Sequence, residues 1–331
     1  MAKTNKLQEV SLPSSAYRLG DSSRYMMIDM LICFSALVGI AIFNFGFRAL
    51  ILTAISVFFA ITFEVAAHIL MKKRITITLA PIVTGMMIAL LLPVAAPYYL
   101  PVFGAGFAIL ICKIPFGGTG SNIFNPAAVA WVFMALIAPF RAVRYSHPGF
   151  EGLGLGITSD FAPANSLLQS LRLGITPNAS FLEIFFGQTP NVMGAGAVFI
   201  LLAILAYLLV RKAISPLIIA TYLSSIAVIA FIFPRLDSRL SSAYYEIFTG
   251  IILFVAIFML TDPASSPKTN LARVLYAVIA AVFTMAIRYH GMFYEGAIIA
   301  VVLVNALAKP LDRLCANITI IMQQRKEGKN A

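Results

Sequence analysis

Two polar stretches interrupt a chain that is otherwise strongly apolar, and they hold most of the residues that could do chemistry. The first, residues 116–126, reads Phe-Gly-Gly-Thr-Gly-Ser-Asn-Ile-Phe-Asn-Pro, and the second, residues 261–267, reads Thr-Asp-Pro-Ala-Ser-Ser-Pro. Polar backbone beside a membrane span has to be enclosed by protein or line a wet cavity. We therefore expect these two breaks to contribute to a binding site.

The glycine-rich break offers backbone N–H groups that can face an anion or a phosphate, because glycine has no Cβ in the way. It lacks the Lys-Ser/Thr of a P-loop and follows no strand, so a tight connection between two half-helices is the alternative interpretation. Asp262 could instead cap the Ser/Pro turn that follows it. The candidate binding residues of the two breaks are Gly117, Gly118, Thr119, Gly120, Asn122, Asn125 and Asp262.

Ionisable side chains inside apolar segments are costly, and by default they are functional candidates. Asp29 lies about one turn into the first apolar segment, and Glu64 and His68 share one helical face of the second because they are four residues apart. These three residues are candidates for an ion path. For Glu64 and His68 the alternative is an ion pair at the helix end, near Lys72, that reaches the membrane surface. Glu295 is a weaker candidate.

The composition indicates a membrane protein. The chain is 60% hydrophobic and 11% charged, whereas a soluble domain usually carries about a quarter charged residues. A span needs roughly 17–25 apolar residues. The sequence predicts ten spans, of which the fourth and fifth are short: Met26–Asn44, Ala49–Met71, Ile75–Pro93, Tyr98–Cys112, Pro126–Phe140, Val192–Val210, Ser215–Phe233, Ala243–Leu260, Leu271–Ile287 and Gly291–Ala308.

A short internal match suggests a duplication. Thr84-Gly85 recurs as Thr249-Gly250, and each apolar run that follows ends in two prolines four residues apart. The two runs cross in opposite directions, as in inverted repeats that place a site between discontinuous helices; a chance match is the alternative. The predicted fold is an all-α polytopic membrane protein with about ten transmembrane helices, arranged as two inverted five-helix repeats with broken or half-length helices.

The predicted spans divide the chain into five parts. They are a cytoplasmic N-terminal segment (1–25), a first membrane repeat (26–140), an external loop (141–190), a second membrane repeat (191–309) and a cytoplasmic tail (310–331). We expect residues 181–186 to form a short interfacial helix, and the chain after Pro310 to form a helix on the membrane surface. Nothing in the polar N-terminal segment resembles a cleaved signal peptide.

The distribution of basic residues and the spacing of the cysteines restrict the topology and the possible functions. Most of the 24 basic residues fall on the side that holds both termini, and the positive-inside rule places that side in the cytoplasm. The basic residues are scattered over separate loops, which argues against nucleic-acid binding. Cys33, Cys112 and Cys315 show no ligand spacing. We expect three unpaired thiols, with a metal shared with another protein of a complex as the alternative.

A series of motifs runs in order through nearly the whole chain. They are Gly-Asp-Ser-Ser-Arg (20–24), Ile-Asp-Met-Leu-Ile (28–32), Gly-Phe-Arg-Ala-Leu (46–50), Phe-Glu (63–64), Val-Thr-Gly (83–85), Phe-Gly-Gly-Thr-Gly-Ser-Asn-Ile-Phe-Asn-Pro-Ala (116–127), Thr-Asp-Pro-Ala-Ser-Ser-Pro-Lys-Thr (261–269), Tyr-Glu-Gly (294–296), Asn-Ala-Leu (305–307) and Leu-Asp-Arg (311–313). Together they resemble the D subunit of the bacterial Rnf ion-translocating electron-transport complex and its relative, the B subunit of the sodium-translocating NADH:quinone reductase.

The resemblance implies flavin. Members of this family carry FMN joined through its phosphate to a hydroxyl side chain, and the matching stretch here has Asp160 in place and Ser166 at the acceptor position. Residues 163–165 depart from the family pattern. The resemblance therefore makes Ser166 the candidate for covalent FMN, and a second, non-covalent flavin is a further expectation.

The expected function is that of a membrane subunit of an Rnf-type oxidoreductase complex in the bacterial inner (cytoplasmic) membrane. The subunit would carry electrons through FMN and couple their transfer to Na⁺ or H⁺ translocation. We expect other membrane and peripheral subunits as partners, and no catalysis by this chain alone. The alternatives are a small-solute transporter or channel with an inverted-repeat fold, and a flavin-free membrane anchor of a redox complex.

Overall fold

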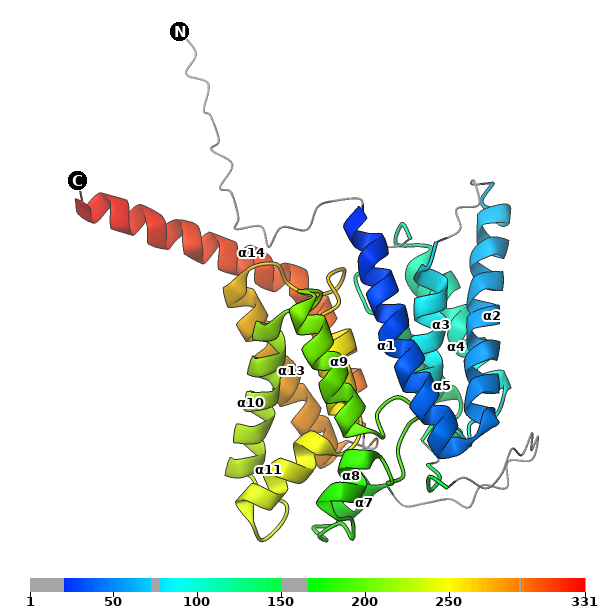
Figure 1. Cartoon of the computed structure of the whole chain (residues 1–331). Coiled ribbons are helices and arrows are strands. Elements are labelled where there is room, and N and C mark those ends of the chain that lie inside the picture. The colour runs from blue at the N-terminus through cyan, green and yellow to red at the C-terminus, as the bar shows by residue number, and fades with distance from the viewer. Residues whose placement is uncertain are drawn as a thin grey trace.

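The protein is built from α-helices in two groups that stand side by side (Figure 1). The structure, a computed structural model, describes residues 21–72, 78–118, 120–143, 145–149, 166–291, 293 and 295–330. Within these ranges no β-strand occurs. The prediction of an all-α protein is confirmed.

The first group holds the N-terminal half of the chain. Its helices are α1 (Asp21–Phe45), α2 (Phe47–Leu70), α3 (Ala80–Leu90), α4 (Tyr99–Gly106), the π-helix η1 (Phe107–Lys113) that continues α4, and α5 (Pro126–Ile137).

Three short helices lie between the two groups in the sequence. They are α6 (Pro139–Ala142), α7 (Leu167–Arg172) and α8 (Phe181–Phe186). Helix α8 is the short helix that the sequence predicts. A reciprocal pair of hydrogen bonds between Ser180 and Glu183 caps its first turn.

The second group holds the C-terminal half. Its helices are α9 (Val198–Val210), α10 (Pro216–Ile232), α11 (Arg239–Phe248), α12 (Ile252–Phe254), the π-helix η2 (Val255–Met259), α13 (Asn270–His290) and α14 (Gly296–Asn330).

The helices differ in their capacity to cross a membrane. Within the described ranges, three are long and apolar enough by length and composition: Ser23–Phe45, Phe47–Leu70 and Asn270–His290. The pair Arg239–Phe248 and Ile252–Met259 passes the same test together, with a bend of 60° between its parts. Five other apolar helices have only 10–17 residues. The polytopic membrane fold is thus confirmed in outline, whereas the ten spans and their inverted repeat stay a prediction.

Helix breaks need internal hydrogen-bond partners in an apolar surrounding. After α3 the chain turns at residues 91–98, and Arg48 from the start of α2 donates to the carbonyls of Val94 (2.8 Å) and Ala96 (3.0 Å). Helix α5 begins with Pro126, whose missing N–H costs nothing in the first turn. Its Asn125 cap accepts from the N–H groups of the next turn.

The two groups share one hydrophobic core. Helix α1 packs against α9, and α5 packs against α14. The ring of Phe34 on α1 lies 4.8 Å from that of Phe258 on η2 and 6.3 Å from that of Phe254 on α12. Buried residues from both groups therefore belong to one apolar cluster.

Helix α14 corrects one expectation. The sequence predicts a separate surface helix after Pro310, but α14 runs without interruption from Gly296 to Asn330 with Pro310 inside it. Proline removes one intrahelical hydrogen bond. Its neighbour Lys309 and, one turn further, Leu314 are exposed. The helix can adjust there without disturbing the core, and it projects beyond the body (Figure 1).

The close approach of α2 and α3 gives a stability prediction. A Cβ at Gly85 would lie 2.7 Å from the Cα of Val57, and the Gly85 carbonyl accepts from Ser56 Oγ at 2.7 Å. We expect Gly85→Ala to lower the free energy of unfolding by about 1–3 kcal/mol, because two backbones would have to separate. The measurement is thermal unfolding in detergent.

Gly39→Ala in α1 is the matched control. A Cβ there meets nothing within 4 Å, so we expect no loss, and a gain of up to about 1 kcal/mol from helix propensity. Equal effects of the two variants would show that α2 and α3 do not pack as described.

Candidate functional site

A cavity of about 900 Å³ lies where the two polar breaks meet. Its walls come from the start of α1, from α3, from the end of η1, from the glycine-rich break and from the break after η2. The start of α1 and the projecting end of α14 lie at the same end of the bundle (Figure 1). Ligand sites in proteins commonly enclose about 300–1,000 Å³, so this cavity has the size of a cofactor site.

The cavity brings together four of the seven binding residues predicted from the two breaks. Gly120, Asn122, Asn125 and Asp262 line it. The other three do not: Gly117 and Gly118 belong to the same loop but not to the lining, and Thr119 lies outside the described residues.

The glycines make the connection between η1 and α5 tight. Gly117, Gly118 and Gly120 have φ of +102°, +88° and +88°, which L-residues with side chains rarely adopt. Gly118 N–H donates to the Lys113 carbonyl at 3.1 Å. Gly117 and Gly118 therefore form a tight connection between two helices, which was the alternative to a role in anion binding.

Asn125 and Asp262 hold the two breaks to each other. Asn125 Oδ1 accepts from the N–H groups of Ala127 (3.1 Å) and Ala128 (3.2 Å), while its Nδ2 donates to Asp262 Oδ2 at 3.4 Å. Asp262 also accepts from Ala264 N–H at 3.1 Å and from Ser265 Oγ at 3.3 Å. Asp262 thus caps the turn that follows it, as the alternative interpretation predicts, and joins that turn to the first break.

Asn122 differs from its neighbours. The residue lines the cavity and is 8% exposed, and its Oδ1 is buried without a hydrogen-bond partner among the described residues. A buried acceptor without a partner costs about 1–3 kcal/mol. Such an atom requires a partner, such as an ordered water, beyond the described residues.

The opposite walls are apolar and rich in sulfur. Four methionines and one phenylalanine contribute to them: Met26, Met27, Met30, Met87 and Phe258. Thioether side chains adapt to irregular shapes and make favourable contacts with aromatic rings. These walls suit a flat aromatic ligand.

Lys113 supplies a buried cation beside the cavity. Its ammonium donates to the Glu64 carboxylate of α2, and both side chains are almost inaccessible. Thr78 Oγ1 donates to the other oxygen of Glu64 at 3.4 Å. The alternative of an ion pair that reaches the membrane surface near Lys72 is wrong for Glu64, because η1 turns Lys113 inward toward α2. His68 Nδ1 contacts the backbone carbonyl of Glu64 at 2.7 Å, and not its carboxylate.

Asp29 lies between the two groups of helices. It accepts from Tyr207 Oη at 2.9 Å and from Arg211 Nε at 3.2 Å, both on the α9 side. The predicted ion-path residues are therefore not one cluster, since Asp29 joins α1 to α9 and Glu64 pairs with η1.

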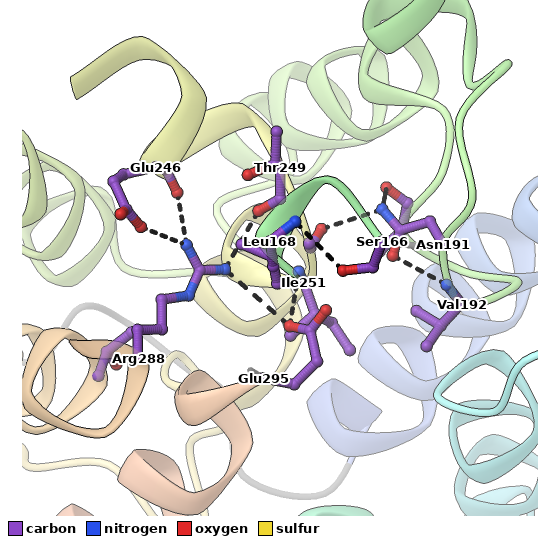
Figure 2. A network of polar contacts seen from close by, with 12 residues as sticks. Ser166, Leu168, Asn191, Val192, Glu246, Thr249, Ile251, Arg288 and Glu295 are labelled. Carbon is purple, nitrogen blue, oxygen red and sulfur yellow. Dashed lines mark hydrogen bonds and ion pairs between the residues drawn. The ribbon is translucent and has the colours of Figure 1, made fainter. Parts of the chain in front are cut away.

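A second cluster of buried charges lies at the break between α11 and α12 (Figure 2). Arg288 of α13 donates from Nη1 to the Glu246 carboxylate (2.9 Å) and from Nη2 to the Thr249 carbonyl (3.1 Å). Arg235 lies 3.0 Å from the other Glu246 oxygen, and Glu295 lies 3.9 Å from Arg288. We call these four residues the Arg288 cluster: Arg235, Glu246, Arg288 and Glu295. Two arginines balance two glutamates, so the buried charge is compensated.

Glu295 also satisfies backbone and side-chain donors. Its carboxylate accepts from the Ile251 N–H at 3.2 Å and from Tyr145 Oη at 3.3 Å. Burial and the neighbouring Glu295 carboxylate raise the pKa of Tyr145 well above its usual value, so the phenol keeps its proton and donates. Glu295 therefore closes the break after Gly250 through its contacts with Ile251 and Tyr145.

Ser166 lies in a small cavity of about 10 Å³ beside Glu295. It caps α7, with Oγ accepting from Leu168 N–H at 3.1 Å, and it is 5% exposed. Figure 2 shows its hydroxyl between Leu168 and Asn191. The space holds about one water-sized group. Asp160 lies outside the described residues.

Sequence reasoning misses four members of these clusters. It assigns no chemistry to Lys113, Arg235, Glu246 or Arg288, and it makes Glu295 only a weak candidate. Glu246 lies within a predicted span, so the rule that singles out Asp29 could have found it. Lys113 gives no such signal, because its position follows a span and its inward turn comes from the π-helix.

The fold and the cavity define a helical membrane protein with a cofactor-sized site between two groups of helices. The family model described as NQR2, RnfD, RnfE family matches residues 11–320. The chain belongs to this family.

Similar proteins with names support this membership. One is the D subunit of the Na⁺-translocating ferredoxin:NAD⁺ oxidoreductase complex of Acetobacterium woodii, 31% identical over 98% of this chain and 99% of the relative. Another is the D subunit of the ion-translocating oxidoreductase complex of Halorhodospira halophila, 32% identical over 70% of this chain and 72% of the relative. The protein of the same name from Escherichia coli is 28% identical over 88% and 92%.

The Arg288 cluster gives a second stability prediction. Arg288→Leu would leave the buried carboxylate of Glu246 with one arginine and the Thr249 carbonyl without a donor. We expect a loss of about 3–5 kcal/mol, typical of breaking a buried ion pair. Thermal unfolding in detergent measures it.

Arg239→Leu is the control at the same end of the bundle. Arg239 is exposed and only lies over the Phe231 ring at 5.6 Å, so we expect a loss of about 1 kcal/mol or less. If Arg288→Leu were equally mild, the cluster would not be the buried network described here.

Proposed function

We propose that this protein is the membrane subunit of an Rnf-type ion-translocating oxidoreductase complex. In this proposal it carries electrons through flavin and takes part in coupling that transfer to Na⁺ or H⁺ movement. It lies in the bacterial inner membrane with both termini in the cytoplasm, and works with other membrane and peripheral subunits. The observation that carries the proposal is the cavity of about 900 Å³ between the two breaks, in a chain whose relatives are named as subunits of such complexes.

The residues around the cavity fit a non-covalently held flavin. The methionine and Phe258 walls can cover the faces of a ring system, and Asn122 and Asn125 line the glycine-rich edge. When bound, a flavin supplies one-electron transfer, while the protein supplies position and electrostatics. The chain's own part is to exclude water, to orient the ring and to hold a compensated charge nearby.

Lys113 and Glu64 are the charged groups that serve this site. The ammonium lies in the cavity wall and is neutralised by Glu64 from behind. A cation next to a group that gains negative charge stabilises the charged form. We include this pair in the proposed coupling, because it is a buried ion pair next to the cavity.

The arrangement of the helices supports the inverted repeat as part of the proposal. Helix α1 contacts α9, and these are the first helices of the two groups; α5 contacts α14, and these are the last helices of the two groups. A two-fold relation between the halves brings such equivalent helices together. Inverted repeats of this kind place a binding site at the interface between the halves, near discontinuous helices.

One prediction of this proposal tests whether the cavity holds flavin. We expect purified wild-type protein, on denaturation, to release riboflavin or FMN in an amount close to one per chain. Val83→Trp should abolish this, because Val83 lines the cavity and the indole fills it. Absorbance at flavin wavelengths and chromatography of the released cofactor provide the measurement.

Val228→Trp is the control, since Val228 is an exposed residue of α10 and should leave the flavin content unchanged. A colourless wild-type protein that binds or conducts a small solute without partners would contradict the proposal and favour a transporter. A colourless protein that still assembles with its redox partners would favour a flavin-free anchor.

Covalent FMN at Ser166 stays a prediction with its own test. After co-expression with a flavin transferase, a fluorescent band on a denaturing gel that is lost in Ser166→Ala would establish the attachment. The buried hydroxyl would then have to leave its capping bond to Leu168 before modification. Ser170→Ala in the same helix is the control. A dark wild-type band, with flavin still released on denaturation, would leave the non-covalent cofactor alone.

A further inference from the structure

Three basic side chains from two distant parts of the sequence come together at the start of α13. Lys268 lies two residues before that helix, whereas Lys309 and Arg313 lie one turn apart on α14, at the base of its projecting part (Figure 1). All three residues are exposed, and none of them forms an ion pair with another described residue. We call these three residues the basic collar.

Asp312 of α14 holds the two parts of the basic collar next to each other. Its carboxylate accepts from the N–H of Lys268 (3.0 and 2.9 Å), from the N–H of Thr269 (3.0 Å) and from the Thr269 hydroxyl (3.0 Å). Arg273 adds a further positive charge nearby, and its Nε donates to the Pro267 carbonyl at 3.1 Å. Four cations thus surround one carboxylate, and this surface is positive on balance.

An apolar stripe on α13 begins three residues after Lys268. Its four members are spaced by four, three and four residues, so they share one face of the helix: Leu271, Leu275, Val278 and Val282. Each of them is more than one third exposed, whereas Tyr276 and Arg288 on the opposite face are buried. Helix α13 is long and apolar enough to cross a membrane. The stripe is therefore the face that α13 presents to its apolar surroundings.

The two features select a ligand with two kinds of chemistry. Basic clusters next to a membrane span attract lipids with negatively charged headgroups, and long basic side chains reach the headgroup level from a helix end. The apolar stripe below the collar suits acyl chains. A free phosphate ion would use the collar alone, and an acidic soluble protein would leave the stripe uncovered. A phospholipid with net negative charge uses both.

We propose that the basic collar and the apolar stripe of α13 form a binding site for an anionic phospholipid. Its phosphate lies among Lys268, Lys309 and Arg313, and an acyl chain lies along the stripe. This site goes beyond the proposed function and does not depend on flavin. In the orientation proposed above, the lipid belongs to the cytoplasmic leaflet. Because it contacts both helices, the lipid also stabilises the junction between α13 and α14.

The test compares two lipids that differ only in their headgroup. Full-length protein in a neutral detergent is titrated with dimyristoylphosphatidylglycerol, which is anionic, or with dimyristoylphosphatidylcholine, which is zwitterionic. Native mass spectrometry measures the fraction of protein that carries a lipid. We expect wild type to bind the anionic lipid at least about tenfold more tightly, because each basic residue near a negative headgroup contributes roughly fivefold.

Charge removal identifies the residues that make the difference. Lys309→Gln combined with Arg313→Gln should weaken binding of the anionic lipid about thirtyfold and leave the zwitterionic lipid unchanged. Lys268→Gln, which leaves α14 intact, should weaken it about fivefold. The matched control combines Lys72→Gln with Arg239→Gln, which removes two exposed cations elsewhere and should have no effect. Thermal unfolding in detergent shows that each variant is folded.

A change in the stripe tests the other half of the site. Leu275→Ser should weaken both lipids by a similar factor and so leave the preference for the anionic lipid unchanged. Equal affinity of wild type for the two lipids, or equal effects of the two double variants, would overturn the proposal. Competition by inorganic phosphate together with an inert Leu275→Ser would reduce the site to an anion site. Loss of a partner subunit in the collar variant, without any lipid preference in wild type, would instead assign the collar to an acidic protein.

Discussion

A broken helix in a membrane protein must find hydrogen-bond partners inside the protein, and this constraint shapes the whole structure. Arg48 serves the carbonyls after α3, and Asn125 serves the first N–H groups of α5. Arg288 and Glu295 serve the carbonyl of Thr249 and the N–H of Ile251 at the break before α12. Long polar side chains are therefore buried where the backbone leaves its helix, and they gather the charges of the core around the breaks.

The two ends of the bundle meet this constraint in different ways. At one end, Asn125 and Asp262 tie the breaks together but leave a cavity between them. At the other end, the Arg288 cluster fills the break with its own compensated charges. Glu295 closes that break by accepting from the Ile251 N–H. One break therefore leaves a cavity, while the other is filled by the protein's own side chains.

The sequence predicted correctly those features that depend on one segment of the chain alone. The helical character, the position of α8, the two polar breaks and the buried Asp29 and Glu64 follow from hydropathy and from the cost of burying charge. It was less informative about pairing. Nothing in the spacing joins Glu64 to Lys113 or Glu246 to Arg288, because these contacts depend on how helices far apart in the sequence pack. The continuous α14 was missed for a related reason, since the rule that proline ends a helix ignores how free the helix is to bend.

The walls of the large cavity have a consequence for how the two groups of helices can move. Met30 of α1 and Val83 of α3 belong to the first group, whereas Phe258 of η2 and Asp262 belong to the second. Any displacement of one group relative to the other therefore changes the shape of the cavity. A molecule bound there would hold the two groups together.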